Sequence, residues 1–220
     1  MWLSHYSLKE NEQKLVDMSD EEFDKYMMSN YADMFIQRNA QEGQKIIVPM
    51  MFGFEIGKGW RHVLDNLCSK LKAIQDLTGY VCVFDQIKEK FGGARFYYHI
   101  DYVNKKTDDK VICKIIDDLV NLHENYCDYV CEELGTNIDP EEKVVVGRWY
   151  YGMGIEGFKK CAEKSWPDSF EDRIKSAESY LERQKKEHKI KNNFYDLNDE
   201  ELDAIDKLVN KYIDDKIQKI

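Results

Sequence analysis

A long apolar stripe between Asp109 and Leu134 constrains the fold of this chain more than any other feature. Apolar residues recur there at the spacing of a helix with one buried face. They are Val111, Ile112, Ile115, Ile116, Leu119, Leu122, Tyr126, Val130 and Leu134. The stripe predicts one amphipathic helix over residues 109–134, packed against a sheet. Gly135 follows the stripe directly and predicts the end of this helix.

Two segments before this helix have the composition of β-strands. Tyr80–Phe84 is β-branched and aromatic, and Ala94–Tyr102 alternates between two faces. Because Phe91-Gly92-Gly93 is a turn signal, we predict an antiparallel hairpin with its loop around residues 89–93. The second strand places a core set and a polar set on opposite faces, namely Ala94, Phe96, Tyr98 and Ile100 against Arg95, Tyr97, His99 and Asp101.

Caps and periodicity predict two further helices. Ser19-Asp20-Glu21-Glu22 is a capping box, which predicts a short helix after it. The Gly57–Trp60 turn leads into a helix over residues 60–77, which Gly79 ends. The stretch at 46–54 reads as a buried extended segment. The apolar positions of the two helices are Phe23, Met27 and Tyr31 for the first and Val63, Leu64, Leu67, Leu71 and Ile74 for the second.

These elements predict an α+β fold, in which a small antiparallel sheet is packed by the helices at 60–77 and 109–134. A further strand is expected over Lys143–Tyr151. The composition changes at Trp166-Pro167, which divides the chain into an α+β domain over 1–165 and a helical C-terminal extension over 166–220. The extension is expected to hold helices at 169–191 and 199–218. Pairing of the last helix would make a homodimer, as an alternative to a monomer.

Charge restricts the kind of partner. The 220 residues include 32 basic and 42 acidic ones, for a net charge of −10. A protein that binds duplex DNA or RNA over its whole surface is usually basic, so this class is disfavoured. A local basic patch remains compatible with the sequence. An acidic surface also suits a protein that docks on a basic groove of a partner.

The glycine hairpin is the most distinctive candidate for a binding site. Its glycines can present backbone N–H groups to an anion, while basic side chains supply charge and an aromatic ring supplies a stacking surface. In the alternative interpretation the glycines only shape the turn and the aromatics fill the core. The candidate ligand- or partner-binding residues are Lys88, Lys90, Gly92, Gly93, Arg95, Tyr97 and Trp60. A basic run at Arg183, Lys185, Lys186, Lys189 and Lys191 is either a phosphate contact or a solvated helix face.

Metal binding and catalysis have weaker signals. His123, Cys127 and Cys131 recur every four residues, a spacing that allows zinc ligation with Cys161 as a fourth ligand. Buried thiols beside the apolar stripe explain the same spacing, and a second short-spaced ligand pair is missing. We therefore expect no metal and no cofactor. Neither a Gly-x-Ser-x-Gly nor a His-Glu-x-x-His motif occurs, so no catalytic residue is assigned.

The sequence carries no membrane or secretion signal that we recognise. Residues 1–10 are polar and mixed, and the longest apolar stretch, at 46–54, is far too short to span a bilayer. We expect a cytoplasmic protein whose six cysteines are reduced thiols.

Three segments together resemble a family of small uncharacterised proteins found mostly in phages and prophages. Tyr31-Ala32-Asp33-Met34-Phe35 is similar to the family's Tyr-Pro-x-x-Phe, and Gly53–Trp60 is similar to its Gly-Phe/Ile-Glu-Cys-Gly-Asp-Gly-Trp. Ile87–Tyr97 is close to the family's Val-Lys-Glu-Lys-Phe-Gly-Gly-Leu-Arg-Phe-Tyr. The resemblance covers roughly residues 24–165.

The family continues with a Cys-Glu-x-Cys-Gly and a later Cys-x-x-His, which together resemble a zinc ribbon. This chain keeps Cys131 and Cys161, but Leu134 and Lys164 stand where the second Cys and the His would be. The resemblance therefore implies a degenerate ribbon without its metal. Ile56 and Lys58 also differ from the Cys and Asp of the family's Gly-Trp segment.

Two main functional hypotheses follow, and a third is a self-associating structural protein that pairs through its last helix. The phage setting implied by the resemblance favours an accessory protein without catalysis that binds a host protein stoichiometrically. Such a protein would act as an anti-CRISPR-like or other anti-defence inhibitor, and a nucleic-acid-guided nuclease is one candidate target. The alternative is a nucleic-acid- or nucleotide-binding protein, with or without catalysis, that uses the basic glycine hairpin at 88–95.

Overall fold

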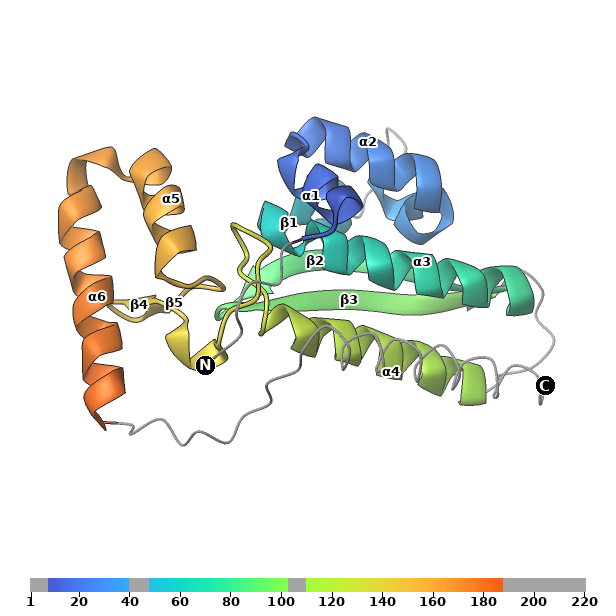
Figure 1. Ribbon diagram of the computed structural model, residues 1–220. Helices are drawn as coiled ribbons and strands as arrows, with labels where there is room; N and C mark the ends of the chain where they lie inside the picture. The colour runs from blue at the N-terminus through green and yellow to red at the C-terminus, as the bar shows by residue number, and fades with distance from the viewer. Residues whose placement is uncertain (1–7, 40–47, 103–109, 188–220) are drawn as a thin grey trace.

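The computed structural model describes residues 8–39, 48–102 and 110–187, and it confirms the predicted α+β class (Figure 1). The α-helices are α1 (Glu10–Asp17), α2 (Asp20–Tyr31), α3 (Arg61–Thr78), α4 (Lys110–Cys127), α5 (Ile155–Ser165) and α6 (Phe170–Glu187). The strands are β1 (Phe54–Glu55), β2 (Tyr80–Lys90), β3 (Gly93–Tyr102), β4 (Val145–Val146) and β5 (Trp149–Tyr150). Short 3-10 turns lie at Ala32–Asn39, Pro49–Phe52, Lys58–Trp60, Pro140–Glu142 and Pro167–Ser169.

The main sheet has the strand order β1-β2-β3. The predicted hairpin of β2 and β3 is confirmed, with both strands paired up to Lys90 and Gly93. The sheet as a whole is mixed rather than antiparallel, because β1 pairs with β2 in parallel. A parallel neighbour needs a crossover connection, which α3 supplies here. β1 has two residues and is too short to show a period in the sequence.

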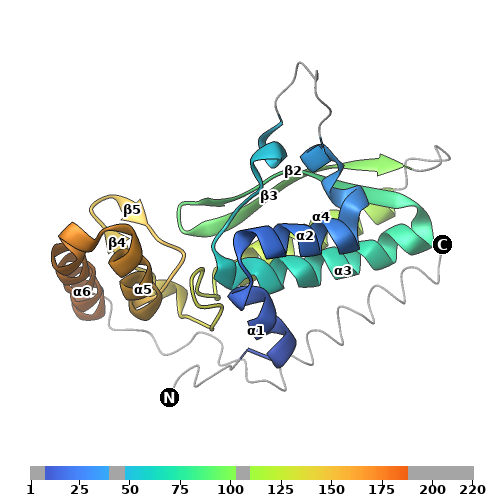
Figure 2. The same ribbon diagram turned by 90° about the horizontal axis from the view of Figure 1, so that it is seen from above.

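The core lies between the sheet and the helices α3 and α4, which follow the length of the hairpin in Figure 2. Ala94 and Phe96 are buried, whereas Tyr97 and His99 are exposed, so the alternation predicted for β3 is confirmed. The apolar residues predicted for the 60–77 helix are also buried. Gly79 ends α3 in the left-handed conformation, with φ of 78°, as its position predicts.

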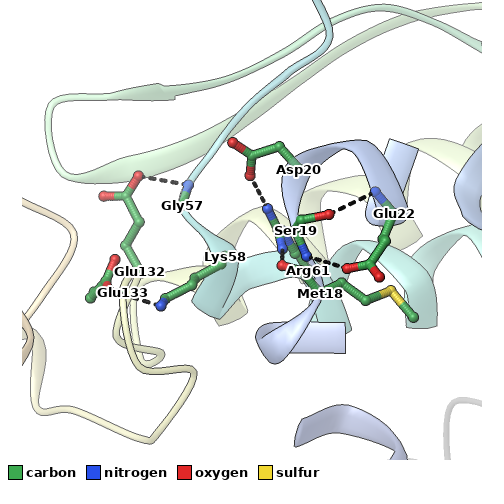
Figure 3. A network of polar contacts seen from close by, with 9 residues as sticks. All are labelled: Met18, Ser19, Asp20, Glu22, Gly57, Lys58, Arg61, Glu132 and Glu133. Atoms are coloured by element: carbon green, nitrogen blue, oxygen red, sulfur yellow. Dashed lines mark hydrogen bonds and ion pairs between the residues drawn. The ribbon is translucent and has the colours of Figure 1, made fainter. Parts of the chain in front are cut away.

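The N-terminal helices are held by a cap and by one buried arginine (Figure 3). The predicted capping box is present: Glu22 N–H donates to the Ser19 hydroxyl at 3.2 Å, and Ser19 N–H donates to the Glu22 carboxylate at 2.8 Å. Arg61, at the start of α3, donates to the Met18 carbonyl at 2.5 Å and pairs with Asp20. The helix predicted after the capping box therefore docks on α3 through its own first turn.

The helix predicted over 109–134 and the extended segment predicted at 46–54 differ from the structure. The helix predicted over 109–134 ends at Cys127, because the chain turns there and Val130 bridges to Asn137. The stripe continues past that end because the residues after the turn are buried too. In the predicted extended segment at 46–54, Pro49 begins a 3-10 turn. That turn leaves Phe52 72% exposed, and residues 46 and 47 lie outside the described part.

A second hydrophobic cluster is built by residues after α4. Its buried members are Cys131, Val144, Met153, Phe158, Ala162 and Ala177. The predicted strand over 143–151 is instead the short hairpin of β4 and β5, since Gly147, with φ of 66°, turns the chain in its middle. Trp166 packs against Tyr151 and Phe158. Both sides of the predicted boundary at 165/166 thus contribute to this cluster, and the division into domains stays a prediction. The helix predicted at 199–218 lies outside the described residues.

Candidate ligand-binding surface

The turn between β2 and β3 has an unusual composition. It consists of Phe91 and Gly92, both in the left-handed region with φ of 56° and 75°. Turns of this kind favour Asn or Gly at the first position, and a residue with a bulky side chain pays about 1–2 kcal/mol there. Phe91 is nevertheless 76% exposed, so its ring recovers little of that cost by burial.

The glycines of the turn let it approach the second hairpin. Gly92 is buried, and a Cβ on it would lie 3.2 Å from the Tyr151 carbonyl carbon and 3.4 Å from the Tyr150 Cβ. Its N–H donates to the Glu89 carboxylate at 2.6 Å. Gly93 is buried as well. The Gly92 N–H, which the sequence offered to an anion, is therefore already bound to a carboxylate.

Three aromatic side chains are exposed where the two hairpins meet. They are Phe91, Trp149 and Tyr150, and they are 76%, 73% and 57% exposed. Both ribbon views place the β2–β3 turn beside β5 (Figures 1 and 2). Sequence reasoning missed Trp149 and Tyr150 because it assigned them to one continuous strand. Their role depends on a tertiary contact with Gly92 that no local pattern encodes.

Basic side chains lie on the same two hairpins. Lys88 and Arg95 are cross-strand partners on the hairpin, and Tyr97 follows on the same face of β3. The Lys88 ammonium lies 5.3 Å from the Tyr97 ring centre, and the Lys90 ammonium 5.5 Å from that of Phe91. Arg148 is exposed in the β4–β5 turn.

We call this set the aromatic–basic surface: Phe91, Tyr97, Trp149 and Tyr150 with Lys88, Lys90, Arg95 and Arg148. Within the described part of the chain, no carboxylate forms an ion pair with any of its four cations. These four cations thus stand without an ion-pair partner in that part of a chain whose net charge is −10, although Glu55 is the register partner of Lys88 on β1.

Lys143 holds the β2–β3 turn in place. Its ammonium donates to the Gly92 carbonyl at 2.7 Å and to the Asp128 carboxylate at 2.8 Å, and its side chain is 13% exposed. The turn is thereby tied to the end of α4. The strand β4 begins two residues after Lys143, so the same lysine connects the two hairpins.

The turn after α4 is tied in the same way to the loop before α3 (Figure 3). Gly57 N–H donates to the Glu132 carboxylate at 3.0 Å, and Lys58 pairs with Glu133 at 3.1 Å. Glu132 N–H donates to the Gly152 carbonyl at 2.7 Å, which connects this turn to the segment just after β5. Burial raises the pKa of Glu132 to about 7, against the lowering effect of the Gly57 N–H.

Trp60 lies apart from the exposed surface. It is completely buried, and its indole N–H donates to the Val130 carbonyl at 2.8 Å. A Cβ on Gly152 would lie 2.5 Å from its ring, so the glycine is needed for this packing. The structure thus places Trp60 in the core, and a binding role for it stays a prediction.

Sequence reasoning also missed the polar pair of Asp85 and His99 on the β2–β3 hairpin. A β-bulge at Asp85 turns its carboxylate toward His99, with 2.9 Å between Oδ1 and Nδ1. Gln37 donates to the same carboxylate at 2.6 Å. The other ring nitrogen of His99 lies 3.8 Å from Asp101. Both ring nitrogens of His99 therefore face carboxylates. A general base presents a ring nitrogen to the substrate, and His99 is not arranged in this way.

The residues considered for zinc are not brought together. His123 contacts Asn66 at 3.0 Å and the Leu119 carbonyl at 2.7 Å. Cys131 lies beyond the end of α4, so it does not share a helix face with Cys127. Leu134 and Cys161 pack on the second hydrophobic cluster. Among residues 8–39, 48–102 and 110–187, no group of three or more His, Cys, Asp or Glu side chains is placed to hold a metal ion.

Comparison of the chain with protein families, with curated proteins and with solved structures finds no match. The resemblance to a phage family accordingly stays a prediction. In the described part of the chain, the helices are too short or too polar to cross a membrane.

Proposed function

We propose that this chain is a non-catalytic nucleic-acid-binding protein that works through the aromatic–basic surface. The observation that carries the proposal is Phe91, which keeps its ring exposed in a backbone conformation that disfavours it. Such strain is retained where a side chain is needed for a task other than stability. Exposed rings interleaved with cations are the recurrent means of holding nucleobases and phosphates.

The local charge supports a polyanionic ligand. Lys88, Lys90 and Arg95 project from one hairpin and Arg148 from the neighbouring turn. Cations that have no carboxylate partner within the described residues are free to contact phosphate. The contacts of Gly92 support the alternative interpretation of the glycines, in which they shape and pack the turn, and we assign the ligand contacts to the side chains around them.

The direct test is a binding titration of the full chain against fluorescein-labelled mixed-sequence DNA and RNA, read by anisotropy. Lys90→Ala combined with Arg95→Ala is expected to weaken binding at least tenfold and to leave the melting temperature unchanged. Lys25→Ala, an exposed cation on α2, is the matched control and should bind like the wild type. An absence of saturable binding up to about 100 µM at physiological salt, the weak end of non-specific affinities, would reject the proposal.

A second candidate is stoichiometric binding of a host protein, for example inhibition of a nucleic-acid-guided nuclease. The observation that favours it is the identity of the exposed aromatics, since Trp and Tyr dominate the energetic centres of protein interfaces. If this candidate is right, a tagged full chain should capture such a partner from bacterial lysate even after nuclease treatment. The candidate is supported only if the purified partner forms a 1:1 complex that Trp149→Ala weakens, and it is rejected if capture disappears with nuclease.

A further inference from the structure

A hollow beside the β4–β5 turn extends the aromatic–basic surface. It has a volume of about 200 Å³ and is lined by Val145, Gly147, Ser176, Ser179, Tyr180 and Arg183. Val145 is buried, and three of the other lining residues, Ser176, Ser179 and Arg183, carry two hydroxyls and a guanidinium. The Arg183 guanidinium lies 5.7 Å from the Tyr180 ring centre.

The hollow is continuous in the chain with the exposed aromatics. Gly147 lines it, and the next two residues are Arg148 and Trp149 of the aromatic–basic surface. Val145 pairs with Tyr150 across the small hairpin. The Tyr150 side chain therefore shares a face of this hairpin with Val145 of the hollow, whereas Trp149 pairs with Val146 on the other face.

The donors of the hollow match a phosphate group. Hydroxyl and guanidinium groups donate hydrogen bonds to phosphate oxygens, and the guanidinium adds charge. No ion pair joins Arg183 to a carboxylate within the described residues, so its charge is not neutralised there. The neighbouring cation Lys185 lies 3.9 Å from Glu142 and is a weaker candidate.

The aromatic side chains distinguish between single and double strands. Stacking on Phe91, Trp149 or Tyr150 requires the face of an unpaired base, which a duplex hides. A duplex also carries about one charge per 1.7 Å of its axis, so the acidic remainder of this chain repels it more strongly than a single strand.

Resting on the proposed function, we infer that the ligand is a single-stranded nucleic acid whose bases stack on Phe91 and Tyr150 and one of whose phosphates binds in the hollow, on Arg183 and the hydroxyls of Ser176 and Ser179. The strand passes from the face of the β2–β3 hairpin across its turn to the β4–β5 turn and α6. DNA and RNA share this chemistry.

The experiment uses the full chain and a labelled oligonucleotide of about 12 nucleotides, as single-stranded DNA, single-stranded RNA and duplex DNA of the same sequence. Affinity is measured by anisotropy over a range of salt concentrations. We expect at least one single strand to bind about tenfold or more tightly than the duplex. Arg183→Ala should weaken that binding and reduce the slope of log affinity against log salt by about 0.7, the amount for one lost phosphate contact.

Two further variants separate a phosphate site from a general loss of charge or of fold. Lys175→Ala removes an exposed cation from the same helix outside the hollow, and it should leave the salt slope unchanged. Ser179→Asp places a carboxylate in the hollow and should weaken binding at least as much as Arg183→Ala, with an unchanged melting temperature.

Each failure has its own meaning. Equal or tighter binding of the duplex overturns the single-stranded inference and leaves nucleic-acid binding in place. Equal behaviour of the Arg183 and Lys175 variants overturns the phosphate site in the hollow. If none of the three nucleic acids binds, the proposed function itself fails, and this inference fails with it.

Discussion

Glu132 accepts a hydrogen bond of 3.0 Å from the N–H of Gly57, which lies 75 positions earlier in the chain. This contact joins the loop before α3 to the turn after α4. Burial and the nearby Glu89 raise the pKa of Glu132, and Gly57, Gly152 and Lys143 lower it, which leaves a net pKa of about 7. The carboxyl group of Glu132 therefore holds two distant segments together, although its buried surroundings disfavour its charged form.

Replacement of this acid should change how stability depends on pH. The folded pKa of Glu132, about 7, exceeds its ordinary value of 4.5, so the folded protein binds more protons between these two values. The free energy of unfolding must then fall as pH rises through that window. Glu132→Gln keeps an acceptor for Gly57 and removes the titration. We expect it to gain up to about 3 kcal/mol over the wild type near pH 8 and nothing near pH 4.

Urea unfolding of both proteins across this pH range measures the difference. Glu133→Gln is the control, since its carboxylate pairs with Lys58 at the neighbouring position. Parallel pH profiles for the wild type and Glu132→Gln would show that the carboxyl group titrates normally in the folded protein.

The close approach of two backbones at Gly59 should not tolerate a side chain. A Cβ there would lie 2.1 Å from the Cys131 carbonyl oxygen and 2.5 Å from the Gly135 nitrogen, and neither atom belongs to a flexible side chain. Gly59→Ala is expected to destabilise the protein by about 3 kcal/mol or more. Gly147→Ala is the matched control: it has open space around it and a φ of 66°, so it should cost only about 1–2 kcal/mol. Similar losses for the two variants in chemical unfolding would contradict the packing argument.

The sequence predicted the start or end of a helix correctly where residues next to that end determine it. The Ser19 capping box begins α2, and Gly79 ends α3, because each residue satisfies backbone groups of its own helix. The end of α4 could not be read in this way. Val130 and Leu134 continue the apolar stripe although the helix stops at Cys127, since they are packed by the turn and by the second cluster.

The candidate site was predictable in part for the same reason. Charge and turn composition drew attention to Lys88 and Arg95, and both lie on the aromatic–basic surface. Trp149 and Tyr150 could not be found, because they join the site only where Gly92 contacts β5. Trp60 belongs to an equally distinctive motif, but this motif serves packing. The Trp60 ring lies against Gly152, and its indole N–H donates a hydrogen bond to the Val130 carbonyl.

Lys143 is expected to matter for the stability of the protein and for the order of the β2–β3 turn. Its ammonium bridges the Gly92 carbonyl and Asp128, so Lys143→Met leaves both without that partner. We expect a loss of about 1–3 kcal/mol in chemical unfolding, together with faster hydrogen exchange at the Gly92 amide. Lys160→Met, an exposed lysine of α5, serves as the control and should change neither. Unchanged exchange at Gly92 would mean that Glu89 alone holds the turn.

Phe91 should show opposite effects on stability and on binding. Asn tolerates the left-handed conformation that Phe91 adopts, so Phe91→Asn is expected to stabilise the protein by about 1 kcal/mol. The same variant removes one stacking ring and should weaken binding of a single-stranded oligonucleotide by about tenfold. Phe52→Asn is the matched control, because Phe52 is also exposed, at 72%, but has no left-handed backbone and lies outside the aromatic–basic surface.

Thermal unfolding and anisotropy titrations of the two variants give the two readouts. A gain in stability with unchanged binding would assign the strain at Phe91 to something other than the ligand. A loss of stability would show instead that the ring makes a structural contribution in spite of its exposure. If the Phe91 ring is kept exposed for stacking, Phe91→Asn must give both a more stable fold and a weaker complex. The strained backbone at Phe91 lowers the stability of the free protein, and the stacking contact of the ring offsets this cost in the complex.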